Sequence, residues 1–385
     1  MRAINVAVDA SRVRSGGGIA HLVGILDLER IDIYGIKFIH LWAYQKLLDS
    51  VPNKPWLIKH HPPETEMSIA HQLYWQSKKL SLEIKAQDCQ VLFTAEASTV
   101  CQFKPMVVLS QNLLPFEKGT LRLFGLSMNR FRQEFIRLVQ KRAFRYADGN
   151  IFLTRYAASC VQDVTGKLSE TRVIPHGVSD VFRRDVVPRI WPKSSDHPIR
   201  CLYISPVFEY KHQWVVVSAI KRLRDQGHNL QLTLVGGGGQ RAKKILEKQI
   251  SISDPDNEFV EVLEFLPPDR IPDFFAQADL FIFASSCETF GITLLEAMAS
   301  GLPIACSDRS SLPEVLQDGG VYFDPTEDTS IAEAVGTLIS NSELRKNLSV
   351  KARALSEAYT WPICAKQTWQ YIVEVYKKTV NGQVK

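Results

Sequence analysis

Short apolar runs alternate with longer stretches of mixed polarity from one end of the chain to the other. The first set of runs is INVAV at 4–8, VLFTA at 91–95, MVVLS at 106–110 and NIFLT at 150–154. A second set is CLYIS at 201–205, LTLVG at 232–236, LFIFAS at 280–285 and LPIACS at 302–307. Helical periodicity lies between them, at 211–225, 240–250, 291–300 and 327–340. Strands that alternate with helices indicate parallel sheets covered on both faces, so the pattern predicts an α/β fold with two Rossmann-like domains.

A proline-bearing stretch, RRDVVPRIWPKSSDHP at 183–198, separates the two series. Proline lacks a backbone donor and interrupts helices and central strands, so this stretch is predicted to be a linker. It divides the chain into a domain at 1–182 and a second at 199–360. An amphipathic helix is predicted at 361–385, and we expect it to return to the first domain. The length of 385 residues suits two hydrophobic cores better than one.

Composition narrows the class of protein. The net charge of +5, from 46 basic and 41 acidic residues, is too small to indicate a nucleic-acid binder. Seven cysteines without a CxxC pair favour reduced thiols in a cytosolic protein over a disulfide framework or a zinc site. The first residues predict a strand rather than a signal peptide, and no run of about eighteen apolar residues predicts a membrane span. We therefore expect a cytoplasmic protein.

The most informative local pattern is SSCETFGITLLEAMASG at 285–301. A predicted strand leads into a loop with Glu288, and a helix then begins near Phe290 and Gly291. In an open α/β sheet, ligands bind beyond the carboxyl ends of the strands, and amides at a helix start can hold a phosphate. Glu296 lies about two turns into the helix. Glutamates at a helix end are often merely solvated, but the apolar neighbours of these two favour a polar partner.

Glu288 and Glu296 resemble the E-x7-E motif of retaining GT-B glycosyltransferases, in particular glycosyltransferase family 4. The similarity continues, in the expected order, through SGGGIAH at 15–21, VIPHGV at 173–178, YISPVFEYKH at 203–212, LTLVGGG at 232–238, SSLPEV at 310–315 and GVYFDP at 320–325. The chain also resembles bacterial mannosyltransferases of surface-polysaccharide synthesis. The resemblance implies a GT-B fold and a nucleotide-sugar donor, bound without a metal or other cofactor.

The resemblance also implies roles for individual residues on the donor side. Glu296 is expected to bind the nucleotide ribose and Glu288 the donor sugar. Lys211 and the amides around Phe290, Gly291 and Ile292 are expected to neutralise the diphosphate. Gly236 and Gly237 either shape the nucleotide pocket or are simply required by a strand–helix turn.

The resemblance makes the segment around Gly17 and Gly18 a glycine-rich loop, whose amides could approach the donor phosphates. The other acceptor-side candidates are Gln111, Asn112 and His176. For His176 a packing or pocket-lining role is favoured over a catalytic one. The chain departs from the family pattern at two points. Pro206 replaces an arginine, and Gln111 and Asn112 stand where many members have a histidine. These departures are compatible with a mechanism without a protein nucleophile, in which electrostatic stabilisation of the leaving phosphate dominates.

Other patterns are interpreted as structural. Asp254-Pro255-Asp256 matches a D-x-D metal motif but lies in a Ser/Asp/Pro turn. His60, His61 and His71 lie in a proline-bearing loop without the spacing of metal ligands. Neither group is predicted to bind a metal.

The segment 118–145 is rich in arginine, lysine and large apolar residues. A basic amphipathic helix of this kind can lie on an anionic membrane, or it can pack on the core with a solvated basic face. The sequence leaves both interpretations open. An acceptor on a polyprenyl lipid would favour the first.

The leading hypothesis is a hexosyltransferase, for example a mannosyltransferase, that uses a GDP- or UDP-sugar. The acceptor would be a glycan or lipid-linked glycan in polysaccharide or lipopolysaccharide synthesis. A sugar-nucleotide 2-epimerase of the same architecture and a non-catalytic nucleotide-sugar-binding subunit are the alternatives. The acid–base residues of an epimerase are not evident, whereas Gln111 and Pro206 are compatible with a non-catalytic subunit.

Overall fold

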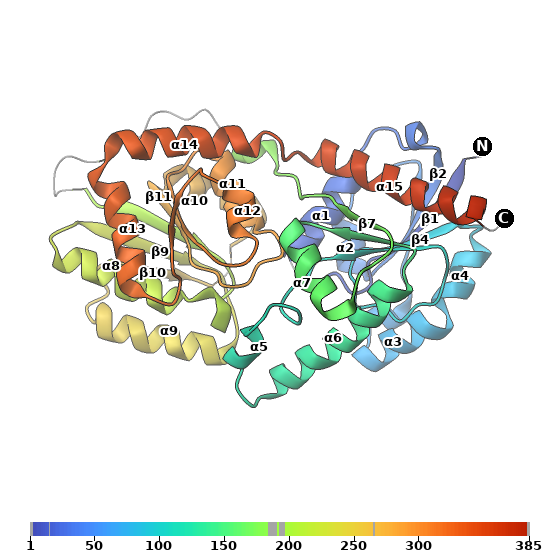
Figure 1. Ribbon diagram of the computed structural model, residues 1–385, viewed down its shortest axis with the longest axis horizontal. Coiled ribbons are helices and arrows are strands. Elements are labelled where there is room, and N and C mark those ends of the chain that lie inside the picture. The colour runs from blue at the N-terminus through green and yellow to red at the C-terminus, as the bar shows by residue number, and fades with distance from the viewer. Residues whose placement is uncertain (1–2, 15, 184–190, 192–196, 265, 383–385) are drawn as a thin grey trace. The chain divides into compact units, whose positions relative to one another are not determined.

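The computed structural model describes residues 3–14, 16–183, 191, 197–264 and 266–382. The chain forms two compact units (Figure 1). The first comprises Met1–Leu121, Gly125–Gly177 and Thr360–Lys385, and the second comprises Arg122–Phe124 and Val178–Tyr359. The units therefore divide slightly before the boundary expected at 182. Most of the expected linker, 183–198, lies outside the described residues.

A parallel sheet with the strand order β3-β2-β1-β4-β5-β6-β7 forms the centre of the first unit. Its strands are β1 (Ile4–Asp9), β2 (Ile36–Trp42), β3 (Leu57–His60), β4 (Val91–Thr94), β5 (Met106–Ser110), β6 (Gly149–Phe152) and β7 (Thr171–Val173). Its α-helices are α1 (Gly16–Leu26), α2 (Gln45–Ser50), α3 (Ile69–Lys78), α4 (Leu80–Ala86), α6 (Met128–Tyr146), α7 (Arg155–Thr165) and α15 (Trp361–Gly382). Short 3-10 turns η1 (Asp32–Tyr34) and η2 (Pro63–Glu66) complete it. Helix α5 (Thr120–Leu123) spans the point where the chain briefly joins the second unit.

The apolar runs of the sequence form the middle of this sheet. Every residue of β4, β5 and β6 is buried, which explains why these strands are nearly continuous in apolar residues. The strand expected at 150–154 ends at Phe152, because the Thr154 hydroxyl accepts a hydrogen bond from the Ala157 amide (3.1 Å) and caps α7. The central strands predicted for the first domain are thus confirmed, and the last of them is shorter than predicted because a helix cap follows it.

Helix α15 belongs to the first unit, as the sequence predicts, although it follows the whole of the second unit in the chain. The Trp369 indole is fully buried, and its Nε1 donates to the Ile25 carbonyl (2.8 Å) in α1. A Cβ atom on Gly24 would lie 2.3 Å from Cδ2 of Trp361, so only glycine allows α15 to approach α1 this closely. The C-terminal helix is therefore an integral part of the first core.

The second unit is built on a parallel sheet with the strand order β10-β9-β8-β11-β12-β13. Its strands are β8 (Ile199–Ile204), β9 (Leu230–Val235), β10 (Val260–Leu263), β11 (Leu280–Phe283), β12 (Ile304–Ser307) and β13 (Val321–Phe323). Its α-helices are α8 (Gln213–Asp225), α9 (Gln240–Ser253), α10 (Ile271–Gln277), α11 (Ile292–Ala299), α12 (Leu312–Leu316), α13 (Asp328–Ser340) and α14 (Ser342–Ser356). The 3-10 turns are η3 (Asp180–Phe182), η4 (Glu209–Lys211) and η5 (Pro268–Arg270). Two parallel sheets confirm the prediction of two Rossmann-like domains.

Two local expectations are wrong. The segment 118–145 is not one helix, because α5 ends at Leu123 and α6 starts anew at Met128, where the Ser127 hydroxyl accepts from the Arg130 amide (3.4 Å). His60 is not in a loop: it ends β3, and its ring stacks on Trp42 with centroids 4.4 Å apart. His71 lies on α3, so of the three histidines placed in that loop only His61 remains there. None of the described helices is long and apolar enough to cross a bilayer.

Candidate functional site

In the second unit, the direction of chain winding reverses between β8 and β11. The chain runs from β8 outward through β9 to β10, and then returns to place β11 on the other side of β8. Loops that leave two such strands diverge and open a crevice at their carboxyl ends. Lys211 lies in η4, after β8, and Glu288 lies in the loop between β11 and α11. The topology therefore brings together the two residues that the sequence analysis placed at the reaction centre.

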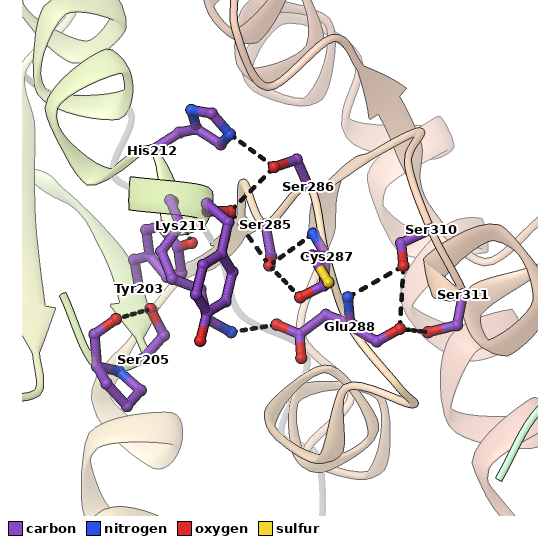
Figure 2. Close-up of polar contacts among 12 residues, drawn as sticks. Tyr203, Ser205, Lys211, His212, Ser285, Ser286, Cys287, Glu288, Ser310 and Ser311 are labelled. Carbon is purple, nitrogen blue, oxygen red and sulfur yellow. Dashed lines mark hydrogen bonds and ion pairs between the residues drawn. The ribbon is translucent and has the colours of Figure 1, made fainter. Parts of the chain in front are cut away.

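Lys211 and Glu288 form an ion pair between Nζ and Oε1 (Figure 2). Their side chains are only 8% and 15% exposed. The Lys211 Nζ also lies 5.2 Å and 5.5 Å from the ring centroids of Tyr210 and Phe283. A charge in such surroundings is tolerated because it is paired, and removing one partner leaves the other buried without compensation.

The backbone of Glu288 is held by two hydroxyls from the loop before α12. Its amide donates to Ser310 Oγ (3.0 Å), and its carbonyl accepts from Ser310 (3.0 Å) and Ser311 (2.9 Å). Figure 2 shows both serines facing the Glu288 backbone. The SSLPEV segment at 310–315 therefore positions the glutamate loop.

The loop that carries Lys211 is tied to the loop that carries Glu288. The Tyr203 hydroxyl donates to the Lys211 carbonyl (2.6 Å), and the Ser286 amide donates to the Tyr210 carbonyl (2.8 Å). His212 Nε2 lies 2.8 Å from Ser286 Oγ (Figure 2). Burial lowers the pKa of His212 to about 4, so this ring is neutral at physiological pH. The site is thus a pre-arranged pair of loops rather than two independent side chains.

Glu296 lies in the second turn of α11, on the same helix that Glu288 precedes. Its side chain keeps partial contact with solvent, yet burial raises its pKa to about 8. The helix starts on Gly291, which has a left-handed φ of 90° and provides no side-chain cap. Phe290 is buried, with its ring centroid 5.7 Å from that of Tyr359. Ile292 is the first helical residue, where the backbone amides of a helix have no partner within the helix.

The glycine run after β9 lies directly against the loop that follows β8. Val207 donates from its amide to the Gly237 carbonyl (2.9 Å), and its carbonyl accepts from the Gly239 amide (2.9 Å). A Cβ on Gly236 would lie 2.3 Å from the Ser205 carbonyl oxygen, and one on Gly238 would lie 2.0 Å from that of Val207. Close backbone approach therefore requires these glycines, which supports the structural alternative for them.

The first unit has a corresponding winding reversal between β1 and β4. Buried polar side chains that the sequence analysis did not identify lie there. Asp9 is buried and accepts from the Ser11 hydroxyl (2.6 Å) and the Gln76 amide (2.7 Å). Glu96 accepts from the Gln140 amide (2.8 Å) and the Ser98 hydroxyl (3.1 Å). Burial raises the pKa of both carboxyl groups. Both residues lie at the carboxyl ends of adjacent strands, and this position was the one sign in the sequence that they belong to a site.

The glycine-rich segment and its neighbours lie at the same edge of the first sheet. Gly17 and Gly18 are in the first turn of α1 rather than in a loop. A Cβ on Gly18 would meet Gln111 Oε1 at 3.0 Å, so these two candidates are adjacent. The Gln111 amide nitrogen donates to the Ala95 carbonyl (2.8 Å), and Asn112 Oδ1 accepts from the Leu114 amide (3.2 Å).

His176 is buried in the first unit, beside a second histidine. Its Nδ1 lies 3.0 Å from Nδ1 of His21, and the ring of Trp361 is 5.8 Å away. Burial lowers the pKa of His176 well below the usual value and that of His21 to about 3. Two neutral rings packed against a tryptophan favour a packing role for His176.

The D-x-D segment supports a turn. The Asp254 carboxylate accepts from the amides of Glu258, Phe259 and Val260, at 2.8, 3.0 and 2.8 Å. Its oxygens are therefore used to hold the chain between α9 and β10.

Comparison with known proteins gives a family match for the second unit. Residues 190–355 match the family described as glycosyl transferases group 1. The O-antigen chain mannosyltransferase B of Escherichia coli is 31% identical over 110 residues, which cover 29% of this chain and 29% of that protein. The chain thus matches about a third of the length of such relatives.

Solved structures share the fold over nearly the whole chain. Sucrose-phosphate synthase of Thermosynechococcus elongatus has a TM-score of 0.75 at 17% identity, covering 97% of this chain and 100% of its own. HepE of Anabaena, solved in complex with UDP and glucose, has a TM-score of 0.72 at 17% identity, covering 96% and 99%. At this identity the likeness concerns the fold alone.

Proposed function

Because the chain has the GT-B fold and its second unit matches the group 1 glycosyltransferase family, we propose that it is a retaining glycosyltransferase. It moves a hexose from a nucleotide-sugar to a glycan or lipid-linked glycan of a cell-surface polysaccharide. The similarity to an O-antigen chain mannosyltransferase supports a mannosyl donor, for which we propose GDP-mannose, and a UDP-sugar is the alternative.

The observation that supports this function best is the Lys211–Glu288 pair at the winding reversal of the second sheet. A donor diphosphate in that crevice would bring its negative charge to Lys211. Glu288 would then be the carboxylate beside the sugar. Glu296, farther along α11, would accept hydrogen bonds from the ribose hydroxyls, and the amides around Ile292 would face a phosphate.

In the proposed reaction, the acceptor oxygen bonds to the anomeric carbon on the face from which the phosphate oxygen leaves. The bond from that carbon to the phosphate oxygen breaks, and the acceptor proton passes to the departing phosphate. The nucleoside diphosphate carries away the bonding electrons. Lys211 stabilises the negative charge that develops on it, which is the term that lowers the barrier most.

This arrangement gives the diphosphate a protein cation, so we propose that transfer needs no divalent metal. Activity measured after treatment with EDTA should equal that of the untreated enzyme. A requirement for magnesium or manganese would show that another group neutralises the phosphates.

Glu288→Gln provides the test of the proposed site. We expect transfer to fall about ten- to hundredfold, because one charge-assisted hydrogen bond to the sugar is lost. Affinity for the free nucleotide should be nearly unchanged, because Glu288 faces the sugar. Isothermal titration with the nucleotide, run beside a transfer assay, separates the two effects. Equal losses in both would contradict the assignment.

The donor is identified by thermal shift with UDP-, GDP- and ADP-sugars, since a ligand that binds the folded state raises the melting temperature. A shift with one base and not the others fixes the donor class. Binding without transfer or donor hydrolysis would favour the non-catalytic alternative.

A further inference from the structure

Helix α6 of the first unit exposes a line of large apolar side chains to solvent. Met128, Phe131, Phe135 and Leu138 are 81%, 64%, 54% and 67% exposed. Their spacing of three and four residues places them on one face of the helix. The opposite face, with Gln140, Ala143 and Phe144, is buried. We call the four exposed residues the α6 stripe.

The exposed stripe excludes one interpretation that the sequence left open. If α6 packed its apolar side on the core and exposed only a basic face, Phe131 and Phe135 would be buried. Leu126, just before the helix, is also 92% exposed, which extends the apolar surface by one residue. Phenylalanine exposed at this level in a continuous line is typical of a surface that binds another apolar phase.

Positive charge surrounds the stripe. The sequence of α6 contains six cationic residues and a single carboxylate, that of Glu134. Arg137 is engaged with Glu134 (3.5 Å) and Arg145 with the Thr165 carbonyl (2.7 Å). Among the residues that the structure describes, Arg130, Arg132, Lys141 and Arg142 have no carboxylate within ion-pair distance. These four are the cations available to an external anion.

We propose that the α6 stripe docks on an anionic lipid surface, with its rings at the boundary between headgroups and acyl chains and its unpaired cations on the lipid phosphates. Charge complementarity selects this occupant, because an apolar line flanked by cations on one helix matches a bilayer that is apolar inside and anionic at its surface. The stripe from Met128 to Leu138 spans about 15 Å along the helix, at about 1.5 Å per residue.

The docked helix would lie close to the winding reversal of the first sheet. Gln140, on the buried face of α6, donates to Glu96 (2.8 Å) and to Ser98 (2.9 Å). Arg132, on the same helix, is near enough to Arg12 to add to the effect of burial, which lowers the pKa of Arg12. Side chains of one helix therefore reach both the proposed lipid surface and the edge of the sheet where the acceptor-side candidates lie.

The proposal is tested by sedimentation of the full chain with vesicles of phosphatidylcholine alone and vesicles that contain about one-third phosphatidylglycerol. We expect binding to the anionic vesicles only, weakened by salt. Phe131→Ser/Phe135→Ser should weaken binding about a hundredfold, because two rings that would be buried in the lipid boundary are lost. Arg130→Gln/Lys141→Gln/Arg142→Gln should weaken it at least about tenfold and reduce its dependence on salt.

Leu82→Ser/Val350→Ser is the matched control, because these side chains are similarly exposed, at 66% and 65%, on α4 and α14. It should bind vesicles like the wild type. Thermal melting shows whether each variant is folded, and nucleotide titration, which the α6 variants should leave unchanged, keeps the result separate from the proposed transferase function. Absence of wild-type binding to anionic vesicles at low salt would overturn the proposal. So would an equal loss in the control variant, or a dimer in solution that the Phe131→Ser/Phe135→Ser variant abolishes while vesicles are not bound.

Discussion

At the winding reversal of the second sheet, a lysine and a glutamate face each other as a buried ion pair, whereas the first sheet has two carboxyl groups at the corresponding place. Lys211 and Glu288 stabilise each other's charge. Asp9 and Glu96 instead accept hydrogen bonds from hydroxyls and side-chain amides, and burial raises their pKa values. The same topology thus presents a fixed cation in one unit and carboxyl groups that hold their protons more tightly in the other.

The difference shows how a repeated architecture acquires two chemistries. The position after two adjacent strands collects polar side chains in both units, but the neighbouring loops decide whether a charge is retained. In the second unit a cation from η4 forms an ion pair with the carboxylate. In the first unit the hydrogen-bond partners are Ser11, Gln76, Ser98 and Gln140, and Arg12 is close enough to lower the pKa of both carboxyl groups in opposition to burial. A buried ion pair with a lysine suits a diphosphate, and hydrogen-bonded carboxyl groups suit hydroxyl groups.

Lys211→Ala is expected to have the largest effect, because it removes the cation that distinguishes the second unit from the first. Without the lysine, Glu288 remains largely buried and unpaired, so the free energy of unfolding should fall by about 3 kcal/mol. Affinity for a nucleotide-sugar should fall about a hundredfold, and affinity for the nucleoside far less, because only the diphosphate loses its cation. Denaturant unfolding and calorimetric titration measure both. Lys351→Ala, which removes an exposed pair with Asp318, is the control and should cost less than about 1 kcal/mol. Equal destabilisation by both variants would contradict the argument.

The glycines of the two units offer a second contrast. In Gly238→Ala the new Cβ would lie 2.0 Å from the Val207 carbonyl oxygen, which belongs to the backbone. In Gly18→Ala it would meet the ends of the Gln111 and Val13 side chains at 3.0 Å. We expect a loss of about 3 kcal/mol for Gly238→Ala and a change within about 1 kcal/mol for Gly18→Ala, since side chains move more readily than backbone. Thermal unfolding of the two variants checks the order, and similar losses would show that the first loop is equally rigid.

Glu296 provides a carboxyl group in the unit that contains the cation, and burial raises its pKa to about 8. If its carboxylate accepts the ribose hydroxyls, binding must release a proton below pH 8. Affinity for a nucleotide-sugar should then rise about tenfold for each pH unit up to that value and level off above it. Titration at several pH values, in buffers of different ionisation enthalpy, measures both the affinity and the proton. Glu296→Gln should bind weakly with no such slope, and a flat wild-type profile would rule out a carboxylate contact.

The smallest expected effect concerns Glu96. Its pKa in the folded state is raised, so its contribution to stability is complete below the unfolded pKa and is lost as pH rises through the folded pKa. Glu96→Gln removes this titration, so the melting temperature of the variant relative to the wild type should increase with pH, by about 2–4 °C. Nucleotide affinity should stay unchanged. A difference in melting temperature that is independent of pH would show that this carboxyl group does not titrate over the range measured.

The sequence allowed prediction of the fold from its apolar runs, and of the donor-side residues from their resemblance to a family motif. Continuous apolar runs predict central strands, and Lys211 and Glu288 each follow such a run, so adjacent strands bring them together. The pairing itself, and the serines that hold the Glu288 backbone, required the structure.

Other elements could not be predicted, because they depend on contacts that the sequence pattern does not show. Strand β10, with the sequence VEVL, exposes Glu261 and Val262 at the edge of its sheet and lacks a continuous apolar run. The polar network around Asp9 and Glu96 joins residues that are far apart in sequence and share no motif. The glycines expected in a loop form the first turn of α1, since helical and loop glycines look alike without the contacts around them.

The position of α15 has a consequence for the order in which the chain becomes folded during synthesis. The second unit is almost continuous in sequence, so it can complete its core as soon as Tyr359 has left the ribosome. The first unit begins to emerge earlier but still lacks Trp369, whose ring lies 6.3 Å from Phe93 in the centre of its sheet. The sheet of the first unit therefore keeps part of its apolar surface uncovered until a helix that is translated after the second unit has emerged. A ribosome stalled at Tyr359 would hold a finished second unit and an unfinished first one.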